Sequence, residues 1–141
     1  IGSVRWKTQI YQGNAYAEFT SYQSQDVTNI GWLISPEIDM DQHENEILQF
    51  QTAQSFVSSA ANSLQVMVCN DFDGVNVESA TWILLNPILP TTTSAYYEFI
   101  KSGEVDLSAF TGKIRLGFKV KGGKDTAIDG TYQVDNIRII Y

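Results

Sequence analysis

The chain has 141 residues, of which 43% are hydrophobic and 18% are charged, and this balance excludes an intrinsically disordered protein. A chain of this length can close one hydrophobic core without disulfides or bound metals, so we expect residues 1–141 to form a single domain. The formal net charge of −7 argues against nucleic acid as a partner, because phosphate binding requires clustered lysine and arginine.

Short apolar runs separated by turn residues follow one another along the whole chain. The expected strands are residues 4–11, 15–20, 31–35, 46–54, 63–70, 81–86, 96–101, 104–108, 113–122 and 130–141. The only candidate helices are short, at Ser55–Asn62 and Leu107–Phe110. Strands at this regular spacing predict an all-β, antiparallel β-sandwich of jelly-roll type. A small closed barrel is disfavoured because several strands carry outer faces too polar to line one.

The last two strands carry the clearest pattern. Residues 113–122 alternate strictly between apolar and basic side chains, which is typical of a strand with one buried and one solvated face. In residues 130–141 the apolar side chains change parity between Val134 and Ile137. A slip of one residue within a strand predicts a β-bulge, here at Asp135–Asn136.

Asp135 is the first candidate metal ligand. A carboxylate at a bulge can supply oxygen atoms to a hard cation without disturbing the hydrogen-bond ladder. Glu18 lies on an early strand, and a sandwich of this kind usually brings its terminal strands together. The functional interpretation is a structural calcium ion held by Asp135 and Glu18. The alternative is that Asp135 caps a turn or accepts backbone N–H bonds.

Motifs of known enzyme classes are missing, and we expect a protein that is not an enzyme. There is no nucleophile elbow, zinc-protease, P-loop or dinucleotide-binding motif, and His43 is the only histidine. Glu37, Asp39 and Asp41 resemble the acidic strand of some glycosidases. Pro36 before them and a polar stretch after them indicate a solvated connection instead.

Two further features have structural interpretations. Cys69 is the only cysteine, so no internal disulfide can form, and we expect a structural thiol. The acidic stretch Asn70–Gly74 resembles half of a calcium loop, but it lacks a ligand position and the flanking helices. An Asx-stabilised turn is therefore the favoured interpretation.

Aromatic residues are abundant, with three Trp, seven Tyr and seven Phe. Four phenylalanines fall on apolar parity and are expected in the core: Phe19, Phe50, Phe99 and Phe118. The candidate ligand-binding rings fall on polar parity, in loops or on ambiguous positions: Tyr16, Tyr22, Tyr96, Trp82 and Trp6. An exposed ring can stack on the apolar face of a sugar while neighbouring amides bind its hydroxyls. The alternative is that these are ordinary sheet-surface aromatics.

Several strings resemble a known family. WLISPEID (32–39) and LQF (48–50) are similar to its first half, and VDLS (105–108) and YQVDNI (132–137) to its second. The family is that of secreted jelly-roll modules of the choice-of-anchor J or cleaved-adhesin type. Such modules are common in Bacteroidetes and distantly related to MAM, galactose-binding and carbohydrate-binding domains. Gly31 departs from the pattern, because an acidic residue is common there.

The resemblance implies a non-catalytic module of an exported protein, often a lipoprotein at the outer-membrane surface. It also implies that a bound calcium ion would use Asp135. No run is apolar enough for a membrane span and Ile1 is not a natural start. We therefore expect part of a longer secreted or surface protein, attached to a membrane only through an anchor outside this chain.

Two functions follow as hypotheses. The first is carbohydrate binding at the cell surface, with a glycan held by loop and sheet-face aromatics. The second is a structural or adhesive domain that binds a surface protein or neighbouring domains and has no sugar site. Exposed apolar surface without a concave aromatic platform would favour the second.

Overall fold

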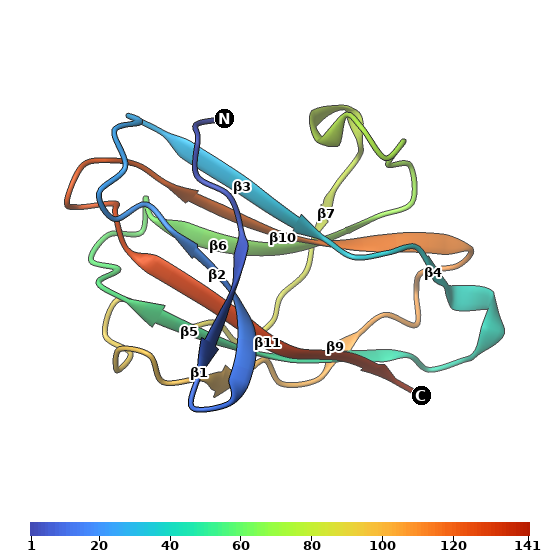
Figure 1. Cartoon of the computed structure of the whole chain (residues 1–141). Coiled ribbons are helices and arrows are strands. Elements are labelled where there is room, and N and C mark those ends of the chain that lie inside the picture. The colour runs from blue at the N-terminus through green and yellow to red at the C-terminus, as the bar shows by residue number, and fades with distance from the viewer.

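The computed structural model describes residues 1–141 and contains two antiparallel sheets packed face to face (Figure 1). The first sheet has the order β1-β2-β11-β5-β8, with β9 also paired to β5. The second has the order β3-β10-β6-β7, with β4 also paired to β10. Successive strands cross repeatedly between the two sheets, so the fold is the predicted β-sandwich of jelly-roll type.

The first sheet consists of β1 (Lys7–Tyr11), β2 (Asn14–Thr20), β5 (Ile47–Ser55), β8 (Ile100–Lys101), β9 (Val105–Asp106) and β11 (Thr131–Ile140). The second consists of β3 (Asn29–Ile34), β4 (Ile38–Asp39), β6 (Ser63–Cys69), β7 (Ile83–Leu84) and β10 (Lys113–Gly122). Helical structure is limited to two 3-10 turns, η1 (Met40–Gln42) and η2 (Val77–Ser79). Neither turn has the length or apolar composition needed to cross a lipid bilayer.

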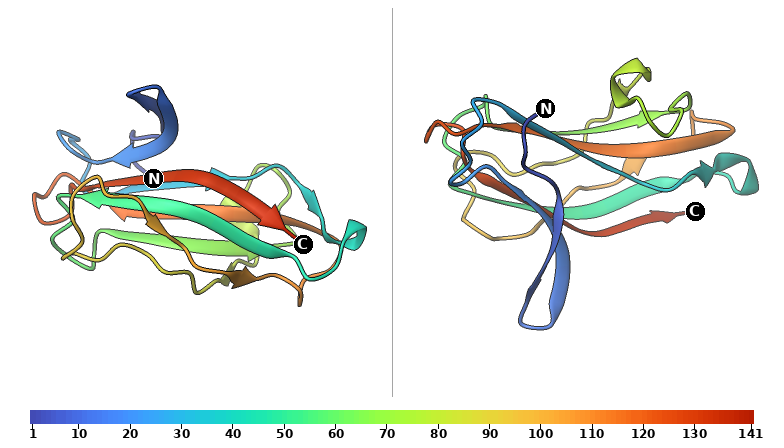
Figure 2. Two further views of the ribbon diagram at one scale, coloured as in Figure 1. Left: turned by 90° about the horizontal axis from the view of Figure 1, so that it is seen from below. Right: turned by 45° about the horizontal axis from the view of Figure 1, so that its top comes forward.

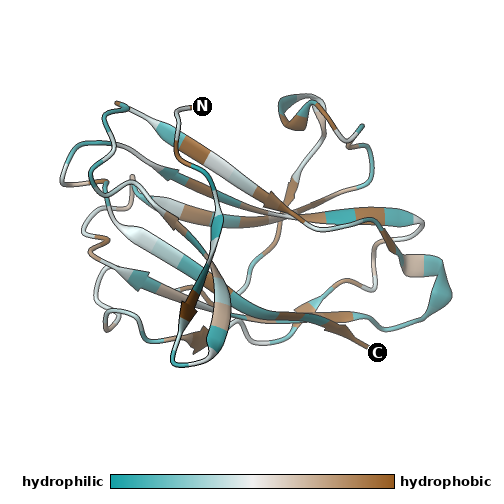
Figure 3. Cartoon of the chain, in the orientation of Figure 1, coloured by the Kyte–Doolittle hydropathy of each residue, from teal (hydrophilic) through white to brown (hydrophobic).

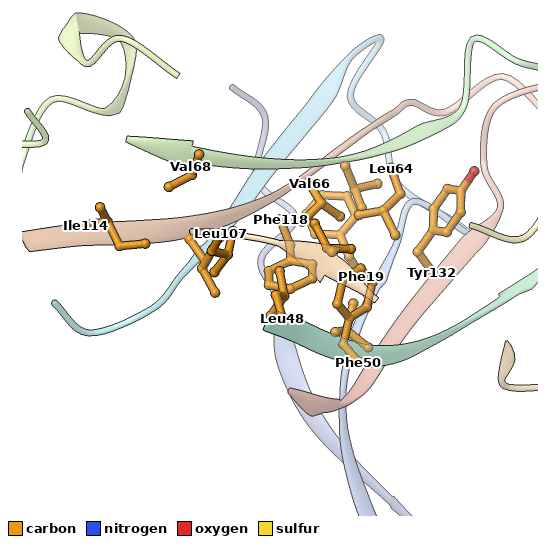
Figure 4. Close-up of a cluster of buried hydrophobic side chains, with 14 of the residues drawn as sticks. Phe19, Leu48, Phe50, Leu64, Val66, Val68, Leu107, Ile114, Phe118 and Tyr132 are labelled. Carbon is orange, nitrogen blue, oxygen red and sulfur yellow. The ribbon is translucent and has the colours of Figure 1, made fainter. Parts of the chain in front are cut away.

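The core fills the space between the sheets, where apolar side chains from the long strands pack together (Figure 4). Hydrophobic and hydrophilic residues are interspersed along these strands (Figure 3). Its largest fully buried apolar side chains are Phe19, Leu48, Leu107, Ile114, Leu116 and Phe118. The rings of Phe50 and Phe118 meet edge to face across the two sheets, with centroids 5.2 Å apart. Phe19, Phe50 and Phe118 are core residues, as predicted.

The bulge in β11 is confirmed. Its register against β5 shifts between Asp135, which pairs with Gln51, and Arg138, which pairs with Gln49. Between these two pairs β11 advances by three residues, whereas β5 advances by only two. Asn136 occupies the left-handed region with φ of 52°, a conformation that asparagine tolerates better than most residues.

Some predicted elements are wrong. The expected strands 81–86 and 96–101 form ladders only at β7 and β8, because the rest of each segment does not pair with a neighbouring strand. Neither candidate helix forms. Phe56 interrupts the first with a φ of 57°, and the second closes only one turn, in which the Phe110 nitrogen donates to the Leu107 carbonyl at 3.0 Å.

The β1–β2 hairpin projects from the sandwich body, as both views in Figure 2 show. β2 pairs with β11 only from Ala17 to Thr20, so residues 9–16 pair only with each other. The hairpin tip therefore forms a wall beside the outer face of the first sheet.

Candidate functional site

The outer face of the first sheet is partly covered by side chains. Ala53 and Gln133 are a cross-strand pair, and each alternates with core residues, so both point away from the core. They are nevertheless only 0% and 2% exposed. Aromatic rings from the hairpin and from the segment before β8 lie beside this face, so that hollows form between them.

The aromatic hollow has a volume of about 600 Å³ between the hairpin wall and the segment before β8. It is lined by Tyr11, Gln12, Asn14, Tyr16, Tyr97, Phe99 and Gln133. The rings of Tyr16 and Phe99 meet edge to face with centroids 5.7 Å apart. Every lining residue is uncharged, so rings and amide or hydroxyl groups provide all the contacts.

The acidic hollow, of about 460 Å³, lies next to it and shares Tyr97. Its lining is Glu18, Thr20, Tyr22, Phe56, Tyr97, Asp129 and Thr131. Tyr22 and Tyr97 remain 67% and 56% exposed, so both rings can accept a ligand. The Phe56 ring packs against Tyr96 at a centroid distance of 4.7 Å.

Two of these rings are held in an unfavourable backbone conformation. Phe56 and Tyr97 have φ angles of 57° and 61°, in the left-handed region that bulky residues rarely occupy. Such strain costs about 1–3 kcal/mol per residue and concentrates at functional sites. The surrounding structure must therefore hold these two residues in place.

Gln54 holds both aromatic loops. Its buried side chain accepts from the Val57 nitrogen at 3.1 Å and donates to the Ser94 carbonyl at 2.7 Å. Its own carbonyl accepts from the Tyr97 nitrogen at 2.9 Å. One residue of β5 thus fixes the loop that carries Phe56 and the loop that carries Tyr97.

Glu18 is one of two carboxylates in the acidic hollow, the other being Asp129. The Glu18 carboxylate accepts from Gln133 Nε2 at 2.8 Å and from Gln9 Nε2 at 3.4 Å. Burial, together with the neighbouring Glu18 carboxylate, raises the pKa of Tyr16 above its usual value. The Tyr16 hydroxyl is protonated at neutral pH, as in any tyrosine, and can donate a hydrogen bond to a ligand.

The five candidate ligand-binding rings do not form one group. Tyr16 lies in the aromatic hollow, Tyr22 in the acidic hollow, and Tyr96 beside Phe56 at the rim. Trp6 packs on the core residue Phe19 with centroids 5.7 Å apart, and its indole nitrogen is buried. That these rings bind a ligand stays a prediction.

Trp82 lies on the opposite side of the molecule, on the outer face of the second sheet. It packs against Trp32 at a centroid distance of 4.8 Å. Gly117 lies beneath both rings, because a Cβ atom there would come within 2.8 Å of Trp82 and 3.1 Å of Trp32. Lys119 lies over the Trp32 ring at 5.2 Å.

The aromatic and acidic hollows together form a groove, and the sequence does not indicate its central residues. Phe99 was expected in the core but is half-buried on the outer face, because residues 96–99 form no ladder and their parity carries no information. The sequence does not single out Tyr97 or Phe56, and it indicates Gln54 only as a residue of the expected strand 46–54. The Tyr96–Tyr97 doublet beside a Pro/Thr-rich loop was the one available signal.

The predicted metal ligands are occupied by N–H donors. Asp135 accepts from Asn14 Nδ2 at 2.9 Å and from the Asn136 backbone nitrogen at 2.8 Å. Glu18 accepts from two glutamine amides, as described above. No three His, Cys, Asp or Glu side chains converge anywhere in the structure. That Asp135 and Glu18 bind a calcium ion stays a prediction.

The other acidic residues have structural roles. Asp39 caps η1 by accepting from the Asp41 nitrogen at 3.0 Å, and Asp41 accepts from the Gly112 nitrogen at 2.9 Å. Glu37 forms an exposed ion pair with Lys113 at 3.3 Å. Asp73 accepts from the Val75 nitrogen at 2.8 Å, which makes the predicted Asx turn.

Comparisons with known proteins define the fold. No protein-family model and no curated protein sequence matches the chain. Among solved structures, the K3 cleaved adhesin domain of Lys-gingipain from Porphyromonas gingivalis w83 is 18% identical, with a TM-score of 0.57. That match covers 98% of this chain and 86% of the other. The CBM22-1 xylan-binding domain of Paenibacillus barcinonensis Xyn10C is 17% identical over 99% of this chain and 81% of that one, with a TM-score of 0.46. The chain is therefore similar in fold to a cleaved adhesin domain.

Proposed function

We propose that this protein is a non-catalytic extracellular module that binds a glycan in the groove formed by the aromatic and acidic hollows. The observation that carries the proposal is the convergence of Tyr16, Tyr97 and Phe99 around an uncharged hollow with two glutamines in its lining. Rings stack on the apolar faces of sugars, while amides and hydroxyls bind sugar hydroxyl groups. The proposal includes secretion or exposure at the outer-membrane surface, in keeping with the acidic composition.

The shape of the groove also supports a ligand larger than a single sugar. The two hollows adjoin at Tyr97 and together follow the outer face of the first sheet. The Glu18 carboxylate in the acidic hollow can accept hydrogen bonds from neutral hydroxyls and would repel an anion. We therefore expect the sugar units in this groove to be neutral.

Affinity electrophoresis and calorimetry with neutral polysaccharides test the proposal: xylan, mixed-linkage β-glucan and galactomannan. Tyr97→Ala should weaken binding about tenfold, since losing one stacking ring costs about 1–1.5 kcal/mol. Trp82→Ala is the matched control, because it removes a ring from the opposite sheet. If no polysaccharide binds, or if the two variants weaken binding equally, the proposal is wrong.

A second role as a protein-contact domain is favoured by one surface. Ile83 and Leu84, the whole of edge strand β7, are 50% and 61% exposed. They belong to the second sheet, whose outer face carries the packed rings of Trp32 and Trp82, with Lys119 over Trp32. Exposed apolar residues of this kind are typical of contacts between domains or proteins. Substituting Ile83 and Leu84 with threonine should abolish such a contact and leave glycan binding unchanged.

A further inference from the structure

A third hollow lies on the same outer face, over the other half of β5. It has a volume of about 550 Å³ and is lined chiefly by Gln49, Gln51, Lys101, Glu104, Asn136 and Arg138. We call it the basic hollow, because two of its side chains are cations. The aromatic hollow holds no charge, and the acidic hollow holds only carboxylates.

Two irregularities of the strands beside β5 create this hollow. On one side, the bulge in β11 adds a residue, which turns Arg138 to the outer face instead of the core. On the other side, the β5 edge partner is interrupted between β8 and β9, where Gly103 has a φ of 73°. Both irregularities leave side chains of β5 accessible between them.

The cations of the hollow have unused donors. Arg138 donates through Nε to Gln49 Oε1 at 3.1 Å, and its two Nη atoms contact no protein acceptor. Lys101 pairs in register with Gln51, and its Nζ has no hydrogen-bond or ion-pair partner in the protein. Glu104 forms no ion pair with either cation. A free guanidinium edge binds a carboxylate through two parallel N–H bonds.

The amide side chains in the basic hollow have donor and acceptor atoms free to bind the hydroxyl groups of a sugar. Asn136 Nδ2 donates to Gln51 Oε1 at 3.1 Å, which fixes the orientation of both amides. This bond leaves Gln51 Nε2 and Asn136 Oδ1 without protein partners. The hollow thus presents a free amide donor, a free acceptor and two free cations, a combination that matches a sugar bearing both hydroxyls and a carboxylate.

The basic hollow lies beside the aromatic hollow on the same face of the first sheet. Asn14 in the lining of the aromatic hollow donates to Asp135, and Asp135 pairs in register with Gln51 in the basic hollow. From Ala53, the partner of Gln133, to Gln49, the partner of Arg138, β5 runs four residues, or about 13 Å. One oligosaccharide can therefore touch both hollows, whereas one sugar ring cannot.

From this arrangement we infer that the glycan is acidic: neutral units occupy the aromatic hollow, and a uronic acid places its carboxylate on Arg138 and Lys101. The inference rests on the proposed glycan-binding function and adds the substrate class. The predicted selectivity is local, because the chain as a whole carries a net charge of −7 and repels polyanions.

The test compares acidic polysaccharides with neutral forms of the same backbone. The probes are polygalacturonate and its methyl ester, alginate and its propylene glycol ester, and glucuronoxylan before and after carboxyl reduction. At least one acidic probe should bind about tenfold tighter than its neutral form, as expected for a charge-assisted hydrogen bond. Arg138→Gln should remove this preference, so that the acidic and neutral forms of a probe bind the variant equally. Glu104→Gln should increase the preference.

Two controls separate the possible failures. Lys121→Gln makes the same charge change on the other sheet and should have no effect, and polyglutamate should not bind. If neutral probes bind and the acidic forms bind no better, the inference is wrong and the proposed function stands. If Lys121→Gln acts like Arg138→Gln, or polyglutamate binds as tightly as an acidic glycan, the hollow is not a uronic acid site. If no polysaccharide binds, the proposed function itself fails.

Discussion

Tyr132 should make the stability of this protein depend on pH in the alkaline range. Its ring is buried in the core on β11, and its hydroxyl donates to the Asn62 carbonyl at 3.0 Å. Burial raises the pKa of Tyr132 to about 12, whereas a tyrosine in the unfolded chain titrates near its ordinary value of about 10. The folded state therefore holds this proton more tightly than the unfolded state does.

The sign and size of the effect follow from this difference. Below about pH 10 both states keep the proton, and the full contribution to stability is present. Above pH 10 the unfolded chain releases the proton while the folded protein keeps it, so the free energy of unfolding falls. The loss ends near pH 12, where the folded state also ionises. A pKa difference of about two pH units corresponds to about 3 kcal/mol.

Urea unfolding followed by tryptophan fluorescence, at several pH values between about 8 and 12, measures this loss. Tyr132→Phe is the reference, because every other titrating group is the same in both proteins. At pH 8 the variant should be about 1 kcal/mol less stable, since it lacks the hydrogen bond to Asn62. By pH 12 wild type should have lost about 2 kcal/mol more than the variant, since the folded-state hydroxyl is by then half ionised. Parallel loss of stability in the two proteins would refute the reasoning.

Three further predictions concern the core, the metal and the cysteine. Gly31→Ala should destabilise the fold by about 1–3 kcal/mol in urea unfolding, because its Cβ would come within 2.1 Å of the Phe19 ring; equal stability would contradict this clash. If calcium binds at Asp135, calcium should raise the melting temperature, and Asp135→Ala should abolish the rise while leaving the metal-free fold intact; an unchanged rise would exclude Asp135 as a ligand. Burial raises the pKa of the Cys69 thiol, so a thiol reagent should react slowly with native protein at pH 8 and rapidly in urea; equal rates would show that the thiol is accessible.

Much of the fold could be predicted because its long strands have one solvent-exposed and one buried face, which makes polar and apolar residues alternate in the sequence. β10 alternates without interruption and was located to the residue, and the parity change in β11 revealed its bulge. Gly31 was noted only as a departure from the family pattern. The structure supplies the reason, since the Phe19 ring occupies the space that a side chain would need.

The groove could not be predicted in the same way. Tyr97 and Phe99 belong to a segment that pairs with no strand, so neither parity nor propensity indicates where their rings point. Their placement depends on the hydrogen bonds that Gln54 makes with Ser94 and Tyr97, which lie forty or more positions further along the chain. The outward position of Tyr16 could be predicted because its strand is regular. Tertiary hydrogen bonds of this kind have no local signature in a sequence.

The projecting hairpin has a consequence for binding kinetics and affinity. Its tip is joined to the body chiefly by two contacts, Asn14 with Asp135 and Tyr16 with Phe99, and both lie at the groove. Amide protons of residues 9–16 should therefore exchange with solvent faster than those of β5 and β11. A ligand that fills the groove must restrict the motion of the hairpin tip. The conformational entropy lost in this step lowers the observed affinity. Cross-linking the tip to β11 in its present position should slow dissociation without adding a single contact to the sugar.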